Sequence, residues 1–404
     1  MLPNFSTNLQ TIKQRQSEFT NNHKKLGQNT KLRIMRFFTQ LLIAAIIPIF
    51  SWGQSLTDEI RVNQLGYYAN TEKRAIVHGS SSSTFDLVDA STQETVFTGS
   101  LSAEGYWVYS NENVAIADFS SVTTEGSFYL VVSDLGKSYT FDISNDVFTD
   151  LAIGSTKAYY YQRASTSLPE QYAGTWHRNA GHPDDNVLVH ASAATAERPT
   201  NTVLSAPKGW YDAGDYNKYI VNSGISTFTF LHLYETMPDY FTNIELNIPE
   251  TGNNIPDILD EALWNIEWML EMQDPNDGGV YHKLTTADFQ GWDMPEDATM
   301  QRWMVQKGTA ATLDFAAIMA MSARIFADFE TELPGFADRC LAAARSAWDW
   351  AVANDNIPYT QSQVKADYDP DIDTGEYPDD YFKDEFSWAG AELFLTTGEQ
   401  QYYD

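Results

Sequence analysis

The sequence predicts an all-β sandwich followed by an all-α domain. Short apolar runs separated by turn residues fill residues 55–145, which is the spacing of strands in a sandwich. From residue 146 onward apolar residues recur at helical intervals, and we find no strand-like run after residue 150. A chain of 404 residues can bury a core in each of two domains. We therefore expect a domain over 55–145 and an all-α toroid or bundle over 146–404.

The first 53 residues differ from the rest and indicate export. They contain seven Lys or Arg and one acidic residue, and the apolar run 37–50 is followed by Ser51-Trp52-Gly53. A basic flank, a short apolar run and small residues are typical of a secretory signal peptide, and the run is short for a membrane span. A 36-residue basic region would be unusually long, so we expect translation to start at Met35 and residues 1–34 to be spurious. The predicted destination is periplasmic or extracellular.

Composition restricts the partners. The net charge is −30 with a pI of about 4.4, so nucleic acid and anionic membranes would be repelled. The balance fits a soluble secreted protein, which we expect to be a monomer, acting on a neutral or insoluble substrate. Cys340 is the single cysteine, so an intrachain disulfide is impossible. Its alanine-rich surroundings predict a buried helical position.

The N-terminal module contains seven strand-like runs and resembles an immunoglobulin-like sandwich without the cysteine pair. Such a module either binds carbohydrate or acts as a scaffold for its neighbour, and the scaffold role is the commoner one. No chemistry is visible in it. The runs are residues 59–63, 74–77, 84–88, 94–97, 114–119, 127–132 and 139–143.

The second domain is predicted to be helical. We place Asn254 as the cap of the third of its helices and Pro256 in that helix's first turn. The run 309–329 is apolar nearly all round, which predicts an inner helix. The polar stretch 164–209 carries three unevenly spaced histidines without nearby acidic or cysteine partners, a poor zinc pattern. The predicted helices are 147–163, one beginning near Asn217, 255–272, 309–329, 336–353 and 384–395, and the histidines are His177, His182 and His190.

The stretch 207–224 carries the strongest functional signal. Asp212 and Asp215 are separated only by Ala213 and Gly214, and aromatic residues flank them. Aromatic rings stack on sugar faces while polar groups bind hydroxyls, so the pattern suits a carbohydrate site. A helix beginning near Asn217 would place Asp215 by its N-terminus, which favours the ionised carboxylate that a general base needs. The alternative is an N-cap aspartate beside an Asx-turn aspartate.

An ordered set of motifs over residues 59–404 resembles glycoside hydrolase family 9, the (α/α)6-barrel cellulases. The resemblance is to the subgroup with an N-terminal immunoglobulin-like domain. Each motif alone is weak, and their order makes the resemblance strong. The motifs are IRVNQLGY at 60–67, YYQR at 160–163, AGHPD at 180–184, GWYDAGDY at 209–216, MLEMQDP at 269–275, GGVYHK at 278–283 and DEFSWA at 384–389.

The resemblance implies inverting hydrolysis of β-1,4-glucosidic bonds without a cofactor for the chemistry. By the family's pattern Asp215 is the general base and Asp212 holds the attacking water. His282 resembles a position that lines the cleft, although a lone loop histidine is more often structural. Among the flanking aromatics, Tyr211 is a predicted substrate contact. Trp210 and Trp292 are either stacking platforms or core residues.

The chain departs from the family at its C-terminal end. The family's general acid is a glutamate in the last helices of the barrel, and no segment here corresponds to it. Glu385 and Glu392 lie in the wrong motif, so no residue is assigned as the acid. We therefore expect an incomplete barrel and a C-terminally truncated chain that is inactive and poorly folded by itself.

An acidic run between Asp367 and Glu385 suggests calcium. Its spacing does not fit an EF-hand. Several family members hold a structural calcium through an Asp-Glu pair that matches Asp384 and Glu385, with a ligand upstream near Asp380. A solvated acidic loop is an equal alternative.

Three classes of function stay open. The leading hypothesis is a secreted endo-β-1,4-glucanase acting on cellulose or a soluble β-glucan. The second is an exo-acting glucosidase or glucosaminidase of the same fold, because the D-A-G-D motif does not report cleft length. The third is a non-catalytic glucan-binding fragment, suggested by the missing acid.

Overall fold

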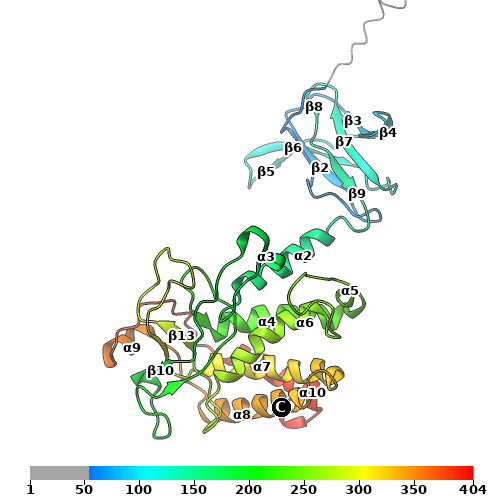
Figure 1. Ribbon diagram of the computed structural model, residues 1–404. Helices are drawn as coiled ribbons and strands as arrows, with labels where there is room; N and C mark the ends of the chain where they lie inside the picture. The colour runs from blue at the N-terminus through cyan, green and yellow to red at the C-terminus, as the bar shows by residue number, and fades with distance from the viewer. Residues whose placement is uncertain (1–53, 404) are drawn as a thin grey trace, which may run out of the picture. The chain divides into compact units, whose positions relative to one another are not determined.

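Figure 1 shows a computed structural model of the chain, which describes residues 54–403. The predicted signal peptide and the predicted start at Met35 lie outside these residues. The described chain forms two compact units that divide between Val147 and Phe148, two residues beyond the predicted boundary. Each unit has a hydrophobic core of its own.

The first unit is the predicted β-sandwich. One sheet has the order β1-β2-β6-β5, and the other has the order β4-β3-β7-β8 with β9 paired to β7. The short strands β5 and β8 have no counterpart in the seven predicted runs. The strands are β1 (Ile60–Arg61), β2 (Arg74–His78), β3 (Thr84–Asp89), β4 (Thr95–Ser100), β5 (Gly105–Trp107), β6 (Glu112–Asp118), β7 (Gly126–Val132), β8 (Gly136–Lys137) and β9 (Phe141–Ile143).

Alternation of apolar side chains explains this sandwich. In β2 and β6 every second residue points inward, and Ala75 pairs with Ala117 across the antiparallel ladder. The opposite sheet supplies larger side chains, including Phe85 and Phe128, to the same core. Small residues on one inner face and large ones on the other let the two sheets interdigitate.

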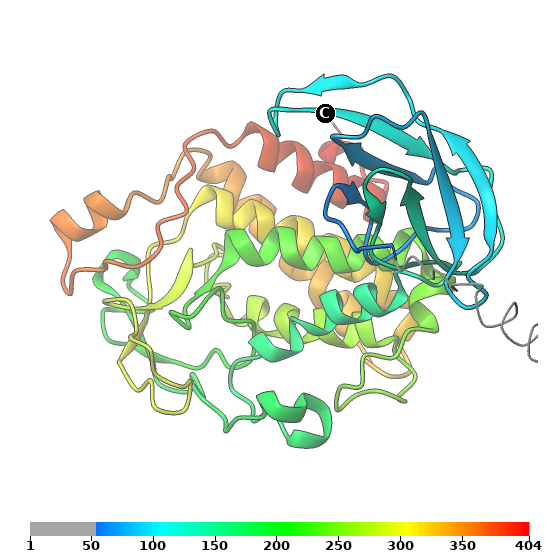
Figure 2. The ribbon, with the colours of Figure 1, turned by 90° about the horizontal axis from the view of Figure 1, so that it is seen from above.

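The second unit is helical and is organised around α7. This helix lies between α4 and α10 and also packs against α8 (Figures 1 and 2). The helices are α2 (Thr149–Lys157), α3 (Glu170–Ala173), α4 (Ile220–Thr236), α5 (Pro238–Thr242), α6 (Asp257–Glu271), α7 (Thr309–Phe326), α8 (Phe336–Ala353), α9 (Gln361–Asp367) and α10 (Lys383–Thr397), with 3-10 turns η1 (Tyr160–Gln162), η2 (Gly174–Trp176), η3 (Ala191–Ala193), η4 (Ala327–Phe329) and η5 (Gln400–Tyr402).

The predicted inner helix is confirmed. In α7 every residue except Arg324 is buried. Within residues 54–403, Thr309–Phe329 is the one helix long and apolar enough to cross a membrane. Because 89% of that window is buried inside the protein, its composition is that of a core helix. Cys340 is likewise buried, on α8, as its alanine-rich surroundings predict.

Several predicted helix starts are wrong by a few residues. The helix expected near Asn217 begins at Ile220, because Lys218 and Tyr219 form a strand instead. The residue that caps α6 is Pro256, not Asn254, and the helix begins one residue later. The side chain of Asn253 supports this turn by accepting a hydrogen bond from the Ile255 N–H at 2.7 Å. The first predicted helix is also shorter and ends in the turn η1.

The expectation of no strands after residue 150 is wrong. A second-unit sheet has the order β11-β10-β14-β13-β12. Each of its strands is two to four residues long, too short for a visible alternation of apolar and polar residues. These strands are β10 (Val187–Val189), β11 (Val203–Leu204), β12 (Lys218–Tyr219), β13 (Lys283–Thr286) and β14 (Arg302–Met304).

Asp260 of α6 provides a test of this helical core. The residue is 5% exposed, and its Oδ2 has no hydrogen-bond partner within residues 54–403. Burial raises the pKa of Asp260 to about 7, with smaller contributions from Glu250 and Asp257. A carboxyl group with a raised folded-state pKa takes up a proton on folding. Its contribution to stability is therefore lost as pH rises through about 7.

We predict that Asp260→Asn abolishes this pH dependence. Relative to the variant, the wild type should lose about 1–3 kcal/mol of unfolding free energy between roughly pH 4 and pH 8. Urea unfolding at both pH values measures the difference. Asp338→Asn, at an exposed carboxylate in the first turn of α8, is the control and should leave the pH dependence unchanged. Parallel curves for wild type and Asp260→Asn would contradict the assignment.

Candidate active site

The D-A-G-D loop is closed by two backbone hydrogen bonds. The Asp212 N–H donates to the Asn217 carbonyl at 3.0 Å, and the Tyr216 N–H donates to the Ala213 carbonyl at 3.4 Å. The residue in the left-handed region is Tyr216, with φ 59°, and not Gly214. A residue other than glycine adopts this conformation only where its surroundings hold it there. The loop therefore presents Asp212 and Asp215 on a constrained backbone.

Asp215 accepts hydrogen bonds mainly at one oxygen. The Asn217 side-chain amide and the Tyr219 hydroxyl both donate to Oδ2, each at 2.9 Å. The Asn217 backbone N–H reaches Oδ1 at 3.4 Å. These donors fix the orientation of the carboxylate. The helix-terminus argument from the sequence is wrong, because β12 separates Asp215 from the start of α4.

Asp212 is held at both oxygens by a different pair of donors. The Asn222 side-chain amide donates to Oδ1 at 2.6 Å, and the Tyr377 hydroxyl donates to Oδ2 at 2.7 Å. Burial and the bond to Asp212 raise the pKa of Tyr377, so its phenol stays protonated and remains a donor. The side chain of Asp212 is exposed, while Asp215 is half-buried. The two carboxylates therefore have separate supports and different access to solvent.

Three of these supports were missed by the sequence reasoning. Asn217 and Asn222 lie inside the stretch 207–224, where their amide side chains were the available signal. Tyr377 lies 165 residues from Asp212 along the chain, and no local pattern connects them. Only the fold brings this tyrosine to the site.

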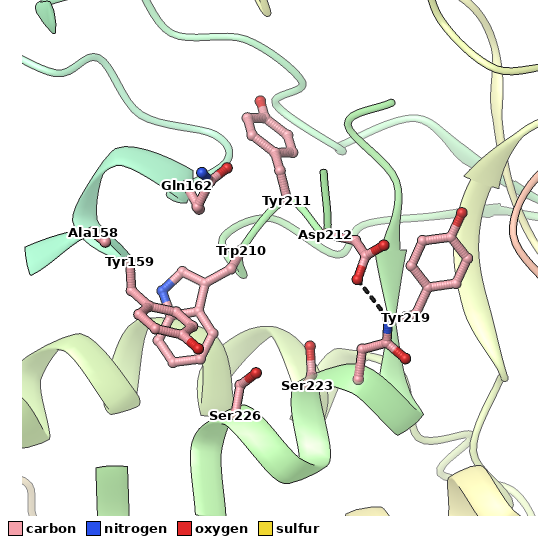
Figure 3. A pocket seen from close by; sticks show the side chains of 10 residues that line it. Ala158, Tyr159, Gln162, Trp210, Tyr211, Asp212, Tyr219, Ser223 and Ser226 are labelled. Carbon is pink, nitrogen blue, oxygen red and sulfur yellow. Dashed lines mark hydrogen bonds between the residues drawn. The ribbon is translucent and has the colours of Figure 1, made fainter. Parts of the chain in front are cut away.

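A pocket of about 270 Å³ opens beside Asp212. In Figure 3, Tyr211 and Asp212 lie across the pocket from Ser223 and Ser226 of α4. Aromatic rings and hydroxyl, amide and carboxylate groups thus line one hollow, the combination that a sugar requires. The lining residues are Ala158, Tyr159, Gln162, Trp210, Tyr211, Asp212, Tyr219, Asn222, Ser223 and Ser226.

Trp210 and Tyr211 line this pocket but are each only 4% exposed. The Trp210 indole N–H donates to Glu261 at 2.8 Å, and its ring packs against Tyr159 at 4.7 Å. The Tyr211 hydroxyl is 2.8 Å from Nδ1 of His182. Both rings are therefore fixed by the core behind them. Their contact with substrate stays a prediction.

His282 is buried, unlike the cleft position that the resemblance suggested, and Trp292 is exposed, which excludes the core alternative for it. His282 is 2% exposed, stacks on Tyr359 at 4.1 Å, and has its Nε2 2.8 Å from the Glu376 carbonyl. Burial lowers the pKa of His282 to about 3, so the ring is neutral. This enclosure favours the structural alternative over a bond to a glucosyl hydroxyl. Trp292 is fully exposed in the segment between β13 and β14 and does not line the pocket.

The three histidines of the 164–209 stretch are not brought together. Each has a polar neighbour of its own. His177 is near the Gly174 carbonyl, and His182 is near the Tyr211 hydroxyl. His190 is near the Ser192 hydroxyl and the Pro370 carbonyl. Across residues 54–403, no group of three or more His, Cys, Asp or Glu side chains is placed to hold a metal ion.

The predicted calcium ligands show one feature that suits a cation. Oε2 of Glu385 is buried without a hydrogen-bond partner within the described chain. Burial, together with Asp379 and Asp384, raises the pKa of Glu385 to about 7. Asp314 of α7 interacts with the same three carboxylates. Upstream of the pair Asp384 and Glu385, Asp379 is the carboxylate that interacts with Glu385.

Two family models match the chain. The model of glycosyl hydrolase family 9 matches residues 148–404. The model of the cellulase N-terminal ig-like domain matches residues 56–137. Together they cover most of both compact units.

Curated relatives are similar over most of this chain. The xyloglucan-specific endo-beta-1,4-glucanase BoGH9A of Bacteroides ovatus is 49% identical over 345 residues, which are 85% of this chain and 58% of the relative. Endoglucanase D of Acetivibrio thermocellus is 35% identical over 349 residues, which are 85% of this chain and 52% of the relative. The chain thus spans about half to three fifths of their length.

Solved structures agree with this likeness. A Bacteroides ovatus GH9 structure superposes with a TM-score of 0.83 at 48% identity, and the match covers 86% of this chain and 63% of the solved chain. A metagenome-derived glycoside hydrolase family 9 endoglucanase superposes with a TM-score of 0.74 at 32% identity, and the match covers 85% of this chain and 62% of the solved chain. The second unit therefore has the architecture of part of that family's helical barrel.

Trp210 can be tested as a core residue. We predict that Trp210→Phe lowers the unfolding free energy by about 1–3 kcal/mol, because the fully buried Glu261 loses one of its donors. Urea unfolding measures the loss. The matched control is Trp292→Phe, at a fully exposed ring, which should leave stability unchanged. Unchanged stability in Trp210→Phe with weakened glucan binding would make Trp210 a substrate platform instead.

Proposed function

The chain belongs to glycosyl hydrolase family 9, and from this premise we propose that the full-length protein is a secreted, inverting endo-β-1,4-glucanase. The observation that carries the proposal is the pair Asp212 and Asp215, held by separate donors beside an aromatic and polar pocket. The endoglucanase names of the relatives support the substrate class. Export is supported by the composition of residues 1–53 alone.

In this proposal Asp215 removes a proton from the attacking water. Its Oδ2 already accepts two hydrogen bonds at 2.9 Å, whereas Oδ1 has one long contact at 3.4 Å. Oδ1 is therefore the oxygen with a lone pair free to accept the water's proton. Since both oxygens of Asp212 are held by donors, that carboxylate can fix the water's position without rotating.

Inverting hydrolysis also needs a carboxylic acid to protonate the departing oxygen, about 6.5–9.5 Å from the base. We assign this role to no residue of this chain. Glu392 forms an ion pair with Arg324 at 2.9 Å, which supports leaving it unassigned.

The substrate is a neutral β-1,4-glucan, and both linear and branched chains are candidates. The 49% identical relative bears the name of a xyloglucan-specific enzyme, so xyloglucan belongs among the first substrates to test. Product sizes from xyloglucan and from cello-oligosaccharides distinguish endo from exo action. Internal cleavage yields a ladder of oligosaccharides, and exo action yields one small product from the start.

We predict that Asp215→Asn in the full-length protein lowers kcat on β-glucan by at least about a thousandfold, because the amide cannot accept the water's proton. Binding of cello-oligosaccharide should change by less than about twofold, since the amide keeps the carboxylate's shape. Kinetics and calorimetry measure the two quantities. Asp239→Asn, at an exposed carboxylate of α5, is the control. Activity that survives Asp215→Asn would refute the assignment of the base.

A structural calcium at Asp384 and Glu385 forms part of the proposal. Supporting it is Oε2 of Glu385, which is buried, has no hydrogen-bond partner within residues 54–403, and would be satisfied by a cation. Since no three acidic side chains of the described residues are already grouped there, binding would have to draw the ligands together. The upstream ligand is open between Asp380, as the resemblance implies, and Asp379, which interacts with Glu385.

We predict that calcium raises the melting temperature of the full-length protein by about 5 °C or more over EDTA, because it binds only the folded state. Differential scanning calorimetry measures the shift. Glu385→Gln should remove it, while Glu332→Gln, at an exposed glutamate, should retain it. Identical melting temperatures in calcium and EDTA would leave the solvated acidic cluster as the explanation.

A further inference from the structure

Tyr219 lies between two segments that are distant in the chain. It is the last residue of β12 and is 1% exposed. On one side its hydroxyl meets Asp215 of the D-A-G-D loop, and on the other it meets Gly375. The ring of Tyr377 packs edge-on against its own ring, with centroids 4.8 Å apart. Tyr219 thus links the D-A-G-D loop to the segment that contains Gly375.

The direction in which the Tyr219 hydroxyl proton points follows from the hydroxyl's contacts with Gly375 and Asp215. The Gly375 backbone N–H donates to the phenol oxygen at 3.2 Å, so that contact occupies a lone pair. The single phenol proton is then free to point at Oδ2 of Asp215, 2.9 Å away. Burial and the adjacent Asp215 raise the pKa of Tyr219, which keeps the phenol protonated. The hydroxyl therefore donates to the base in one fixed direction.

Gly375 is itself held in place by the buried Lys283. The ammonium donates to the Gly375 carbonyl at 2.6 Å, to Gln361 at 2.8 Å and to Thr374 at 3.1 Å. Three acceptors match the three protons of the charged amine, although burial lowers the pKa of Lys283 to about 7. A Cβ on Gly375 would lie 3.0 Å from the Tyr219 hydroxyl, so alanine there would displace the Tyr219 ring slightly. The support under Tyr219 is consequently rigid.

We propose that Tyr219 is the positioning residue of the general base, holding Oδ2 of Asp215 so that Oδ1 faces the water. The proposal rests on the proposed function for the role of Asp215. It adds that segment 374–377 aligns both carboxylates, through Gly375 and Tyr219 for Asp215 and through Tyr377 for Asp212. Without the phenol, the Asn217 amide is the one donor left to Oδ2 within residues 54–403.

The kinetic test is Tyr219→Phe in the full-length protein. We expect kcat to fall about 10- to 100-fold with KM within about twofold, because alignment matters most in the transition state. The acidic limb of the pH–rate profile should move up by about half a unit to one unit, since the carboxylate loses a donor that favours its ionised form. Tyr160→Phe is the matched control, because Tyr160 is fully buried and its hydroxyl has no partner within residues 54–403.

A second readout does not depend on activity. In protein labelled with ¹³C at aspartate carboxyls, Asp215→Asn identifies the Asp215 signal, and its titration midpoint should be higher in Tyr219→Phe than in wild type. If wild type hydrolyses no β-glucan but the midpoint still rises, the proposed function fails and the hydrogen bond stands. An unchanged midpoint and pH profile in folded Tyr219→Phe would overturn the positioning role. Gly375→Ala, which crowds the Tyr219 hydroxyl, should also raise the titration midpoint of Asp215. This variant replaces Tyr219→Phe in the test if Tyr219→Phe does not fold.

Discussion

The hydrogen bond from Tyr219 to Asp215 depends on a contact between residues 156 positions apart in the chain. Segment 374–377 reaches both carboxylates of the D-A-G-D loop. Gly375 donates to the Tyr219 hydroxyl that holds Asp215, and Tyr377 donates to Asp212. Within the stretch 207–224, Asn217 donates to Asp215 and Asn222 donates to Asp212. Alignment of the two carboxylates therefore depends both on the motif's own neighbours and on a segment that only the fold brings to them.

Buried charges make the surroundings of the site rigid. Behind the pocket, Glu261 pairs with Arg163 at 3.1 Å and accepts the Trp210 indole N–H. Beside the loop, Lys218 pairs with Asp184 at 2.7 Å, and both side chains are buried. Removing one partner of such a pair leaves an uncompensated charge, which is costly. Polar networks of this kind fix the direction of the site's side chains more tightly than apolar packing alone.

Much of the fold could be predicted because its elements carry their own periodicity. Alternating residues revealed the sandwich, and the apolar run that became α7 showed that this helix is buried all round. The second-unit sheet could not be predicted, since strands of two to four residues are shorter than the pattern that would reveal them. For the same reason the predicted start of α4, near Asn217, is too early, because β12 intervenes before Ile220.

The candidate site was predictable where its residues are neighbours in sequence. Asp212 and Asp215 follow from the motif, whereas Tyr377 and Gly375 reach them only through tertiary packing. The most direct test of the account is the anomeric configuration of the first product released from a β-1,4-glucan by the full-length protein. A ¹H NMR time course should show the α-anomer first, because Asp215 activates a water opposite the departing group. The β-anomer first would contradict Asp215 as the base of an inverting enzyme.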